Sequence, residues 1–254
     1  MRLTSLIITL LLSANSLFAS HDQDPPLKEP LKLFASEAVN ARPDLPGTLR
    51  LDFGFNFLQN EPTNMGIGFF GSKVFNITYI KDIQLGDSKI SIHPGIGLGL
   101  EKYSFSSNVT LVSSFSQGQR SSVNVVNLAS IYGASSEFDK TKLAVNYIDV
   151  PLEFRYRIGN DIDRGLMVGF GGKVGFLYSS HTKIKYSRAD ENFSIKTKDQ
   201  FELNRFRYGL TGRVGTPGFS GWYYYGLNTL FKDGKGPQGT EATQFMAGIS
   251  FALF

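Results

Sequence analysis

Residues 48–58 read TLRLDFGFNFL, and the spacing of their side chains is the clearest structural signal in the chain. Every odd position from Leu49 to Phe57 is apolar, while the even positions between them carry Arg50, Asp52, Gly54 and Asn56. Strict alternation predicts a β-strand with one apolar and one polar face, because successive side chains of a strand point to opposite sides. One such strand fits a soluble sandwich as well as a membrane barrel, so its recurrence matters.

The period of two recurs in seven further runs, at 68–80, 90–105, 142–158, 166–180, 201–215, 222–231 and 243–254. Connections after the second, fourth and sixth runs are short, whereas those after the first, third, fifth and seventh are mostly longer. An even strand number with turns at one end and loops at the other predicts an all-β fold, an eight-stranded antiparallel transmembrane up-and-down β-barrel. A soluble sandwich has no reason to sort its connections in this way.

Composition agrees with this fold class and excludes others. Among the 254 residues 41% are hydrophobic and 19% are charged, so a disordered chain is not expected. Beyond the N-terminal segment no apolar run approaches the ~18 to 20 residues of a membrane-spanning helix. The chain has no Cys, which excludes disulfides, thiolate chemistry and a Cys-linked lipid anchor. The net charge of +4 is scattered, so no nucleic-acid partner is predicted.

Three segments are expected along the chain. Residues 1–19 combine Arg2, a short apolar stretch and small residues, which predicts a signal peptide cleaved after Ala19 and therefore export. Residues 20–47 contain five prolines and are interpreted as a Pro-rich periplasmic leader. Residues 48–254 then form the barrel in the bacterial outer membrane.

The polar faces of the predicted strands carry most of the barrel's charge. An eight-stranded barrel is just wide enough for side chains to fill it, so these charges are expected to pair across the lumen and leave no open pore. Inward glycines, among them Gly99 and Gly175, leave space for large side chains or for the leader. The predicted lumen charge network comprises Arg50, Asp52, Lys73, Glu101, Asp149, Glu153, Arg155, Arg157, Lys173, Arg205, Arg207 and Arg213.

Two further strand features are expected. The fourth run changes phase between Leu143, Val145 and Tyr147 and the positions that follow, which predicts a β-bulge near 147–149. Aromatic residues near strand ends are expected in interfacial girdles: Tyr103, Tyr147, Tyr156, Tyr178, Trp222 and Tyr224.

The run KLAVNYIDVPL at 142–152, followed by GFGGKVG at 169–175, resembles the outer-membrane β-barrel family that is abundant in Bacteroidota. That family includes the PorT-like proteins linked to type IX secretion. The resemblance covers roughly 49–254 and implies the fold, an outer-membrane location and a Bacteroidota source, but it brings no catalytic residues and no cofactor. Strand-end Phe251 and Phe254 resemble the terminal aromatic signal that barrel-assembly machinery recognises in its clients.

Two motifs that point to specific chemistry, a nucleotide-binding string and a candidate catalytic set, are only weakly supported. GIGFFG at 66–71 matches a dinucleotide-binding string but lacks the preceding strand and following helix that such a site needs. For a lipid-modifying enzyme the best set is Ser179 with His181 and Asp190 or Glu191; His21 lies in the leader and His93 lies beside Ser91 on an inward face. No catalytic, metal or cofactor site is predicted.

The sequence therefore predicts a non-enzymatic, plugged outer-membrane barrel that acts as an accessory or structural subunit of an outer-membrane assembly, with secretion as a candidate process. Expected partners are outer-membrane lipid and lipopolysaccharide, a larger outer-membrane protein, and the assembly machinery during biogenesis. The external loop at 106–141 could be a fringe or could fold over the barrel and bind a partner, while the cationic stretch at 181–200 would meet lipopolysaccharide phosphates. A small transport channel and a lipid-modifying barrel enzyme are the alternatives.

Overall fold

The computed structural model describes residues 47–62, 64–159, 165–189 and 191–253, all of which lie in a single unit of the chain. The predicted signal peptide at 1–19 lies outside the described residues. The leader at 20–47 lies outside them apart from Gly47, and so does Phe254 of the predicted assembly signal. Those three interpretations therefore stay predictions.

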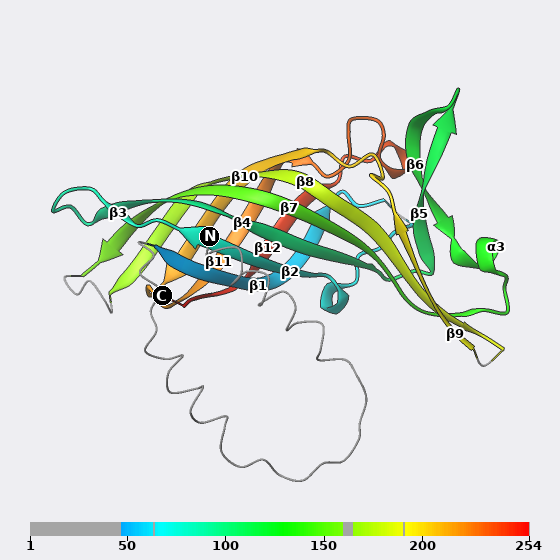
Figure 1. Ribbon diagram of the computed structural model, residues 1–254, viewed down its shortest axis with the longest axis horizontal. Helices are drawn as coiled ribbons and strands as arrows, with labels where there is room; N and C mark the ends of the chain where they lie inside the picture. Colours follow the sequence, from blue (N-terminus) through cyan, green and yellow to red (C-terminus); the bar gives the residue numbers. More distant parts are fainter. Residues whose placement is uncertain (1–46, 63, 160–164, 190, 254) are drawn as a thin grey trace, which may run out of the picture. The chain divides into compact units, whose positions relative to one another are not determined.

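Eight antiparallel strands form a closed ring of backbone pairing, which confirms the predicted fold class (Figure 1). β1 pairs with both β2 and β12, and β8 pairs with β10, so the sheet has no open edge within the barrel. The ring strands are β1 (Thr48–Gln59), β2 (Lys73–Ile80), β4 (Ile90–Phe105), β7 (Glu137–Ile158), β8 (Leu166–Arg188), β10 (Phe206–Gly215), β11 (Phe219–Thr229) and β12 (Thr243–Ala252).

The two faces of each strand differ as the alternation requires. On β7 the outward side chains from Ile148 to Ile158 are apolar and exposed, while inward Asp149 and Glu153 are buried. On β8 the same outward belt runs from Leu166 to Tyr178. At ~3.3 Å per residue and a tilt of about 40°, the ten steps from Ile148 to Ile158 on β7 span about 25 Å, which matches the apolar band of an outer-membrane barrel. These belts mark the membrane-spanning segments.

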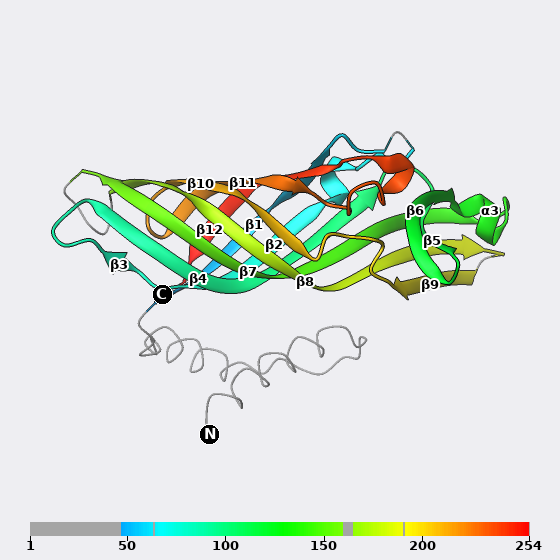
Figure 2. The same cartoon turned by 90° about the horizontal axis from the view of Figure 1, so that it is seen from above.

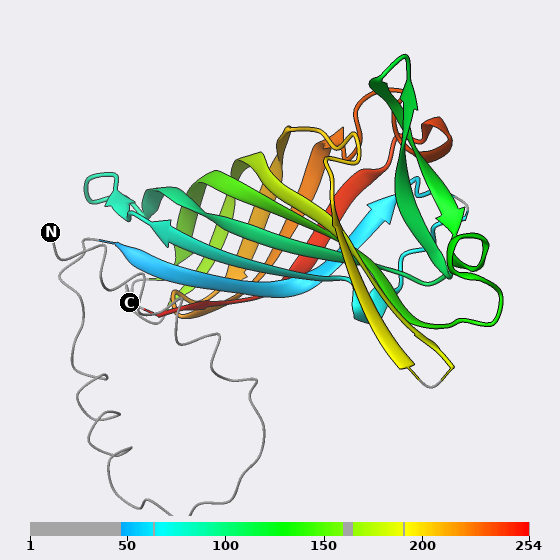
Figure 3. The same ribbon diagram turned by 45° about the vertical axis from the view of Figure 1, so that its right-hand side comes forward.

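Additional structure gathers at the loop end of the barrel (Figure 3). β5 (Val109–Ser116) and β6 (Gln119–Asn127) form a separate hairpin, followed by the short helix α3 (Leu128–Tyr132). β9 (Glu191–Lys198) adds to the part of β8 that continues beyond the belt. Short 3-10 turns lie at Phe69–Gly71 (η1) and Pro237–Gly239 (η2), and β3 (Ile83–Gln84) pairs with β4 near the opposite, short-turn end (Figure 2). Among the described residues no helix has the length and apolar content to cross a membrane.

The hairpin folds over the mouth of the barrel rather than forming a fringe. Val109, Leu111 and Val123 of the hairpin are buried in one apolar cluster with side chains from the barrel interior. Backbone and side-chain bonds hold it from two sides: the Val123 amide donates to Lys235, and Arg120 pairs with Asp199. The remaining members of this apolar plug are Met65, Tyr103, Phe105, Leu143, Val145, Tyr147, Phe201, Leu203, Leu230, Phe231 and Ala242.

The β-bulge expected near 147–149 in the fourth run is not found on that strand. β7 keeps one inward phase from Thr141 to Glu153, so Leu143, Val145 and Tyr147 face inward with the charged positions, and β7 has no extra residue within this stretch. The register shift lies instead on β8, where Tyr178 is the extra residue opposite Asn146 and Tyr147. The apparent phase change in β7 is a change of interior chemistry from charged to apolar.

The aromatic girdle is also smaller than expected. Tyr156 and Tyr178 are exposed on the outer wall, but Tyr103, Tyr147, Trp222 and Tyr224 are buried. Each of the four lies on the inward phase of its strand, where it fills the lumen instead of facing the lipid headgroups.

Candidate functional site

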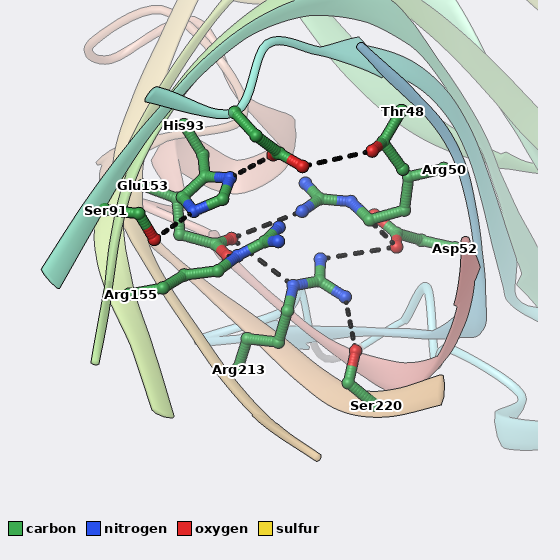
Figure 4. Close-up of polar contacts among 10 residues, drawn as sticks. Thr48, Arg50, Asp52, Ser91, His93, Glu153, Arg155, Arg213 and Ser220 are labelled. Atoms are coloured by element: carbon green, nitrogen blue, oxygen red, sulfur yellow. Dashed lines mark hydrogen bonds and ion pairs between the residues drawn. The ribbon is translucent and has the colours of Figure 1, made fainter. Parts of the chain in front are cut away.

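The barrel interior at the short-turn end holds a cluster of alternating charges, here called the turn-end network (Figure 4). The Glu153 carboxylate accepts from Arg155 Nε at 2.5 Å and from Arg213 Nε at 3.3 Å, and it lies 3.5 Å from Arg50 Nη1. Asp52 pairs with Arg50 at 3.5 Å and with Arg213 at 3.3 Å. Arg213 Nη1 also donates to Ser220 Oγ at 2.9 Å.

These five charged residues come from three strands that ring closure places around one cross-section: β1, β7 and β10. Arg50 and Asp52 lie two positions apart on β1, as Glu153 and Arg155 do on β7, so each pair projects from the same face. A buried charge is costly unless it is paired and hydrogen-bonded. The network meets that requirement by placing two carboxylates among three guanidinium groups.

A second cluster, the mid-barrel network, lies deeper in the lumen and centres on Arg207. Its guanidinium donates to both oxygens of Asp149, at 3.0 and 2.8 Å from Nη2, and it pairs with Glu101 as well. The same group stacks on the Tyr147 ring at 3.8 Å. Lys173 lies 3.4 Å from Asp149 and 4.5 Å from the centre of the Tyr224 ring.

Two inward glycines make room for this ion pair. A Cβ on Gly99 would lie 2.5 Å from Asp149 Oδ2 and 2.6 Å from Arg207 Nη2. A Cβ on Gly175 would meet Asp149 and would lie 2.7 Å from Arg207 Nε. The glycines on β4 and β8 therefore leave space for a large charged pair, which is the first of the two roles considered for them.

Polar contacts continue from Arg207 to the apolar plug. Glu101 accepts from the Tyr103 hydroxyl at 2.8 Å and from Gln244 Nε2 at 2.9 Å, and Gln244 also donates to Tyr103 at 2.7 Å. The interior thus passes from charged to mixed to apolar layers along the barrel axis. A residual cavity of about 20 Å³ lies among the charged side chains, including Arg50, Asp149 and Arg213. That volume suits about one water molecule.

At the short-turn end a serine, a histidine and an aspartate form a hydrogen-bonded chain. Ser91 Oγ lies 2.7 Å from His93 Nε2, and His93 Nδ1 lies 2.5 Å from Asp82 Oδ1. Because an ionised carboxylate only accepts, His93 Nδ1 donates to Asp82 in this contact. Ser91 is 1% exposed and His93 is 2% exposed. The hydrogen bond with His93 lowers the pKa of Asp82 below its ordinary value.

The structure places ten of the twelve expected network residues in or at the edge of the lumen. Eight are buried: Arg50, Asp52, Glu101, Asp149, Glu153, Lys173, Arg207 and Arg213. Arg155 and Arg157 are partly exposed toward the short-turn end. The prediction is wrong for Lys73 and Arg205, which do not face the lumen. Lys73 is exposed because it shares the outward phase of Phe75 and Ile77, and Arg205 is exposed in the bend before β10, where alternation does not apply.

The residues considered for a lipid-modifying enzyme do not come together as a catalytic site in the described part of the chain. Ser179 and His181 lie on β8, and Glu191 pairs in register with Arg188 at the far end of β9. Asp190 and His21 lie outside the described residues. Among the described residues no group of three His, Cys, Asp or Glu side chains could hold a metal ion.

Sequence reasoning missed Asp82 of the Ser91–His93–Asp82 chain and Gln244, which contacts Glu101 and Tyr103. Asp82 precedes β3 in a connection, where no period could place it. Gln244 lies on the inward phase of the last strand, and that phase could have found it.

Comparison with known families agrees with this architecture. Residues 47–232 match the model of the outer membrane protein beta-barrel domain. The chain belongs to that family, and it is an outer-membrane β-barrel protein. The outer membrane is accordingly its location.

Comparisons with individual proteins are more distant. Ail, the attachment invasion locus protein of Yersinia pestis, shares 12% identity over 82% of this chain and 97% of its own, with a TM-score of 0.34. A mutant of the Rhodopseudomonas blastica porin shares 11% identity over 82% of this chain and 99% of its own, with a TM-score of 0.21. A search of curated proteins found no significant match.

Replacing Arg207 by Met should destabilise the barrel by about 3–5 kcal/mol, because Glu101 and Asp149 would lose the guanidinium between them. The measurement is urea unfolding in lipid vesicles, followed by the fluorescence of Trp222, the one tryptophan of the chain. Arg205→Met is the matched control, since Arg205 is exposed, and it should change stability by less than about 0.5 kcal/mol. Equal unfolding midpoints for the two variants would contradict the assigned role of Arg207.

The Asp82–His93 contact should stabilise the barrel in a pH-dependent way. Because folding lowers the pKa of Asp82, its contribution is present above the unfolded pKa and is lost as the pH falls through the folded one. The unfolding midpoint of Asp82→Asn should therefore lie below that of the wild type near pH 7, and the difference should shrink as the pH falls below the ordinary Asp pKa of about 3.9 and disappear once Asp82 is protonated in the folded state. A difference that persists unchanged in acid would show that Asp82 does not act through its charge.

Proposed function

We propose that this outer-membrane barrel is a non-conducting, non-enzymatic anchor that presents a folded external structure to a larger outer-membrane protein. The observation that carries the proposal is the filled interior. Two charge networks and the apolar plug occupy the lumen among the described residues, and the cavity among the charged side chains measures about 20 Å³. A transport channel would need a continuous aqueous path instead.

The hairpin and its surroundings support the anchoring role. The hairpin residues Val112 and Phe115 are exposed, as are Ile131 of α3 and Phe193 of β9. The hairpin itself is fixed at its base, because Val109, Leu111 and Val123 are buried in the plug. A rigid base under exposed apolar side chains suits recognition of another protein.

The buried serine favours a structural role over a catalytic one. Ser91 has a base and an acid in line, but its 1% exposure leaves no room for a substrate carbonyl beside Oγ. We assign the Ser91–His93–Asp82 chain to the polar filling of the short-turn end.

The secretion link and the segments outside the described residues belong to the same proposal. The resemblance of 142–152 and 169–175 to PorT-like Bacteroidota barrels supports an accessory role in a secretion assembly. Residues 1–19 would direct export, the short turns would face the periplasm, and Phe251 with Phe254 would serve recognition by the assembly machinery.

Purified protein should give no unitary conductance in a planar bilayer, because charged side chains and the apolar plug fill the lumen that the described residues form. A general porin inserted under the same conditions provides the positive control for the recording. Reproducible single-channel steps from folded, heat-modifiable protein would overturn the non-conducting assignment and favour the small-channel alternative.

Tagged protein extracted from native outer membranes in mild detergent should co-purify with a larger membrane protein at fixed stoichiometry. Val112→Ser with Phe115→Ser should abolish this association, because the change removes the exposed apolar surface of the hairpin. Ile83→Ser with Leu85→Ser makes the same chemical change at the short-turn end and should retain it. Recovery of the wild type as a lone barrel of monomer mass would contradict the accessory-subunit role.

A further inference from the structure

The outer wall of the barrel carries eight lysines on one sector, just beyond the apolar belt. On β7, Lys140 and Lys142 alternate with buried Thr141 and Leu143, so they project outward. On β8, Lys183 lies between the buried residues Thr182 and Ile184. The lysine face consists of Lys73, Lys102, Lys140, Lys142, Lys183, Lys185, Lys196 and Lys198.

Strand register places these side chains in rows across five strands. One row runs Lys73, Lys102, Ala144, His181 and Lys198 from β2 to β9. The next row sets Lys142 opposite Lys183, which in turn lies opposite Lys196. A third sets Lys140 opposite Lys185. Directly opposed like charges destabilise a sheet, so three such rows call for an explanation.

Nothing in the described part of the chain neutralises this charge. None of the eight lysines forms an ion pair with a described carboxylate, whereas Lys173 and Lys232 elsewhere do. Partial burial and the charges of Lys102 and Lys140 lower the pKa of Lys142. Partial burial and the charges of Lys196 and Lys198 likewise lower the pKa of His181. The unpaired positive charge of this surface favours the binding of an anion from outside the chain.

A groove opens on the same wall directly below the lysines. It has a volume of about 740 Å³, and its apolar part includes Phe53, Phe55, Phe75 and Leu100. Lys73, Lys102 and His181 line it as well. Phe55 stacks against Phe69 of η1 at 4.8 Å, which extends the aromatic surface. Figure 3 shows β9 and the adjoining ends of β7 and β8 extending away from the barrel.

We propose that the groove and the lysine face bind a phosphorylated glycolipid of the outer leaflet, the lipid A class. Its acyl chains would lie along the phenylalanines, and its phosphates would meet Lys73, Lys102 and the rows above them. The sequence of side chains along the strands supports a lipid: apolar side chains lie at membrane depth, and the lysine pair Lys73 and Lys102 lies two residue pairs beyond Phe75 and Leu100, on the same face. Clustered Lys beside a membrane is the pattern that attracts anionic lipid headgroups.

A lipid fits this surface better than a nucleic acid or an acidic protein. Either of those would be held by the lysines alone and would leave the apolar groove empty. The lysines also lie on the face opposite the hairpin and plug, since the inward side chains of β7 and β8 are the buried ones. Lipid binding therefore uses a surface separate from the hairpin surface assigned to a protein partner.

The test is titration of detergent-solubilised full-length protein with diphosphoryl lipid A, dephosphorylated lipid A and inorganic phosphate, read by native mass spectrometry. Diphosphoryl lipid A should bind well above the other two. Lys73→Gln, Lys102→Gln and Lys183→Gln combined should weaken its binding at least about tenfold. Lys81→Gln, Arg205→Gln and Lys235→Gln remove equal charge elsewhere and should leave it within about twofold, with heat-modifiability confirming that both variants fold.

Each arm can overturn the proposal. Equal loss in both triple variants would show that general charge, not this face, controls binding. Equal binding of dephosphorylated lipid A would leave only an apolar groove, and binding of inorganic phosphate at the same strength would leave an anion site without lipid specificity. Because the hairpin is intact in all these variants, co-purification of a protein partner reports on the proposed anchor separately.

Discussion

Closure of eight strands into one ring sets the terms for every other feature of this barrel. In lipid no sheet edge can stay unpaired, so β1 must meet β12 and β8 must meet β10. A ring of eight leaves an interior of side-chain width, and each charge on an inward position must then find its partner across that space. The Arg207 guanidinium shows the result, because Glu101 and Asp149 hold it from two other strands while Tyr147 covers its plane.

The side chains of the interior change from charged to apolar along the barrel axis because the two ends have different surroundings. At the short-turn end, charges and the Ser91–His93–Asp82 chain fill the lumen with groups that tolerate nearby water. At the loop end the barrel is covered by the β5–β6 hairpin, whose buried Leu111 and Val123 need an apolar floor. Leu143, Val145 and Tyr147 provide it from the same inward phase that carries Asp149 and Glu153. The hairpin is therefore held by the barrel it closes.

Alternation alone predicts the strand number, the ring and eight buried charges, because a period of two assigns each residue to a face. It cannot predict which charges meet, since pairing such as Arg213 with Asp52 depends on register across 161 residues. Predictions based on residue type alone fail where they disagree with the strand phase. Tyr103 and Tyr147 are expected at the lipid surface as aromatics, yet they continue the inward phase of Glu101 and Asp149. Asp82, in a connection, carries no periodic signal.

The parts of β7 and β8 beyond the apolar belt, together with β9, form an outer extension that carries two different surfaces. Its inner face carries stacked aromatics, with the Tyr186 ring centred 4.9 Å from that of Tyr132 in α3 and 5.0 Å from that of Phe193 in β9. Its outer face carries the opposed lysines, whose mutual repulsion acts against strand pairing in β7, β8 and β9. An anionic lipid on that outer face would remove this repulsion and favour the paired form of the extension. The membrane surface would then help to order the outer extension. Lipid binding on the outer wall would thereby be linked to the hairpin surface, with no change in the filled lumen.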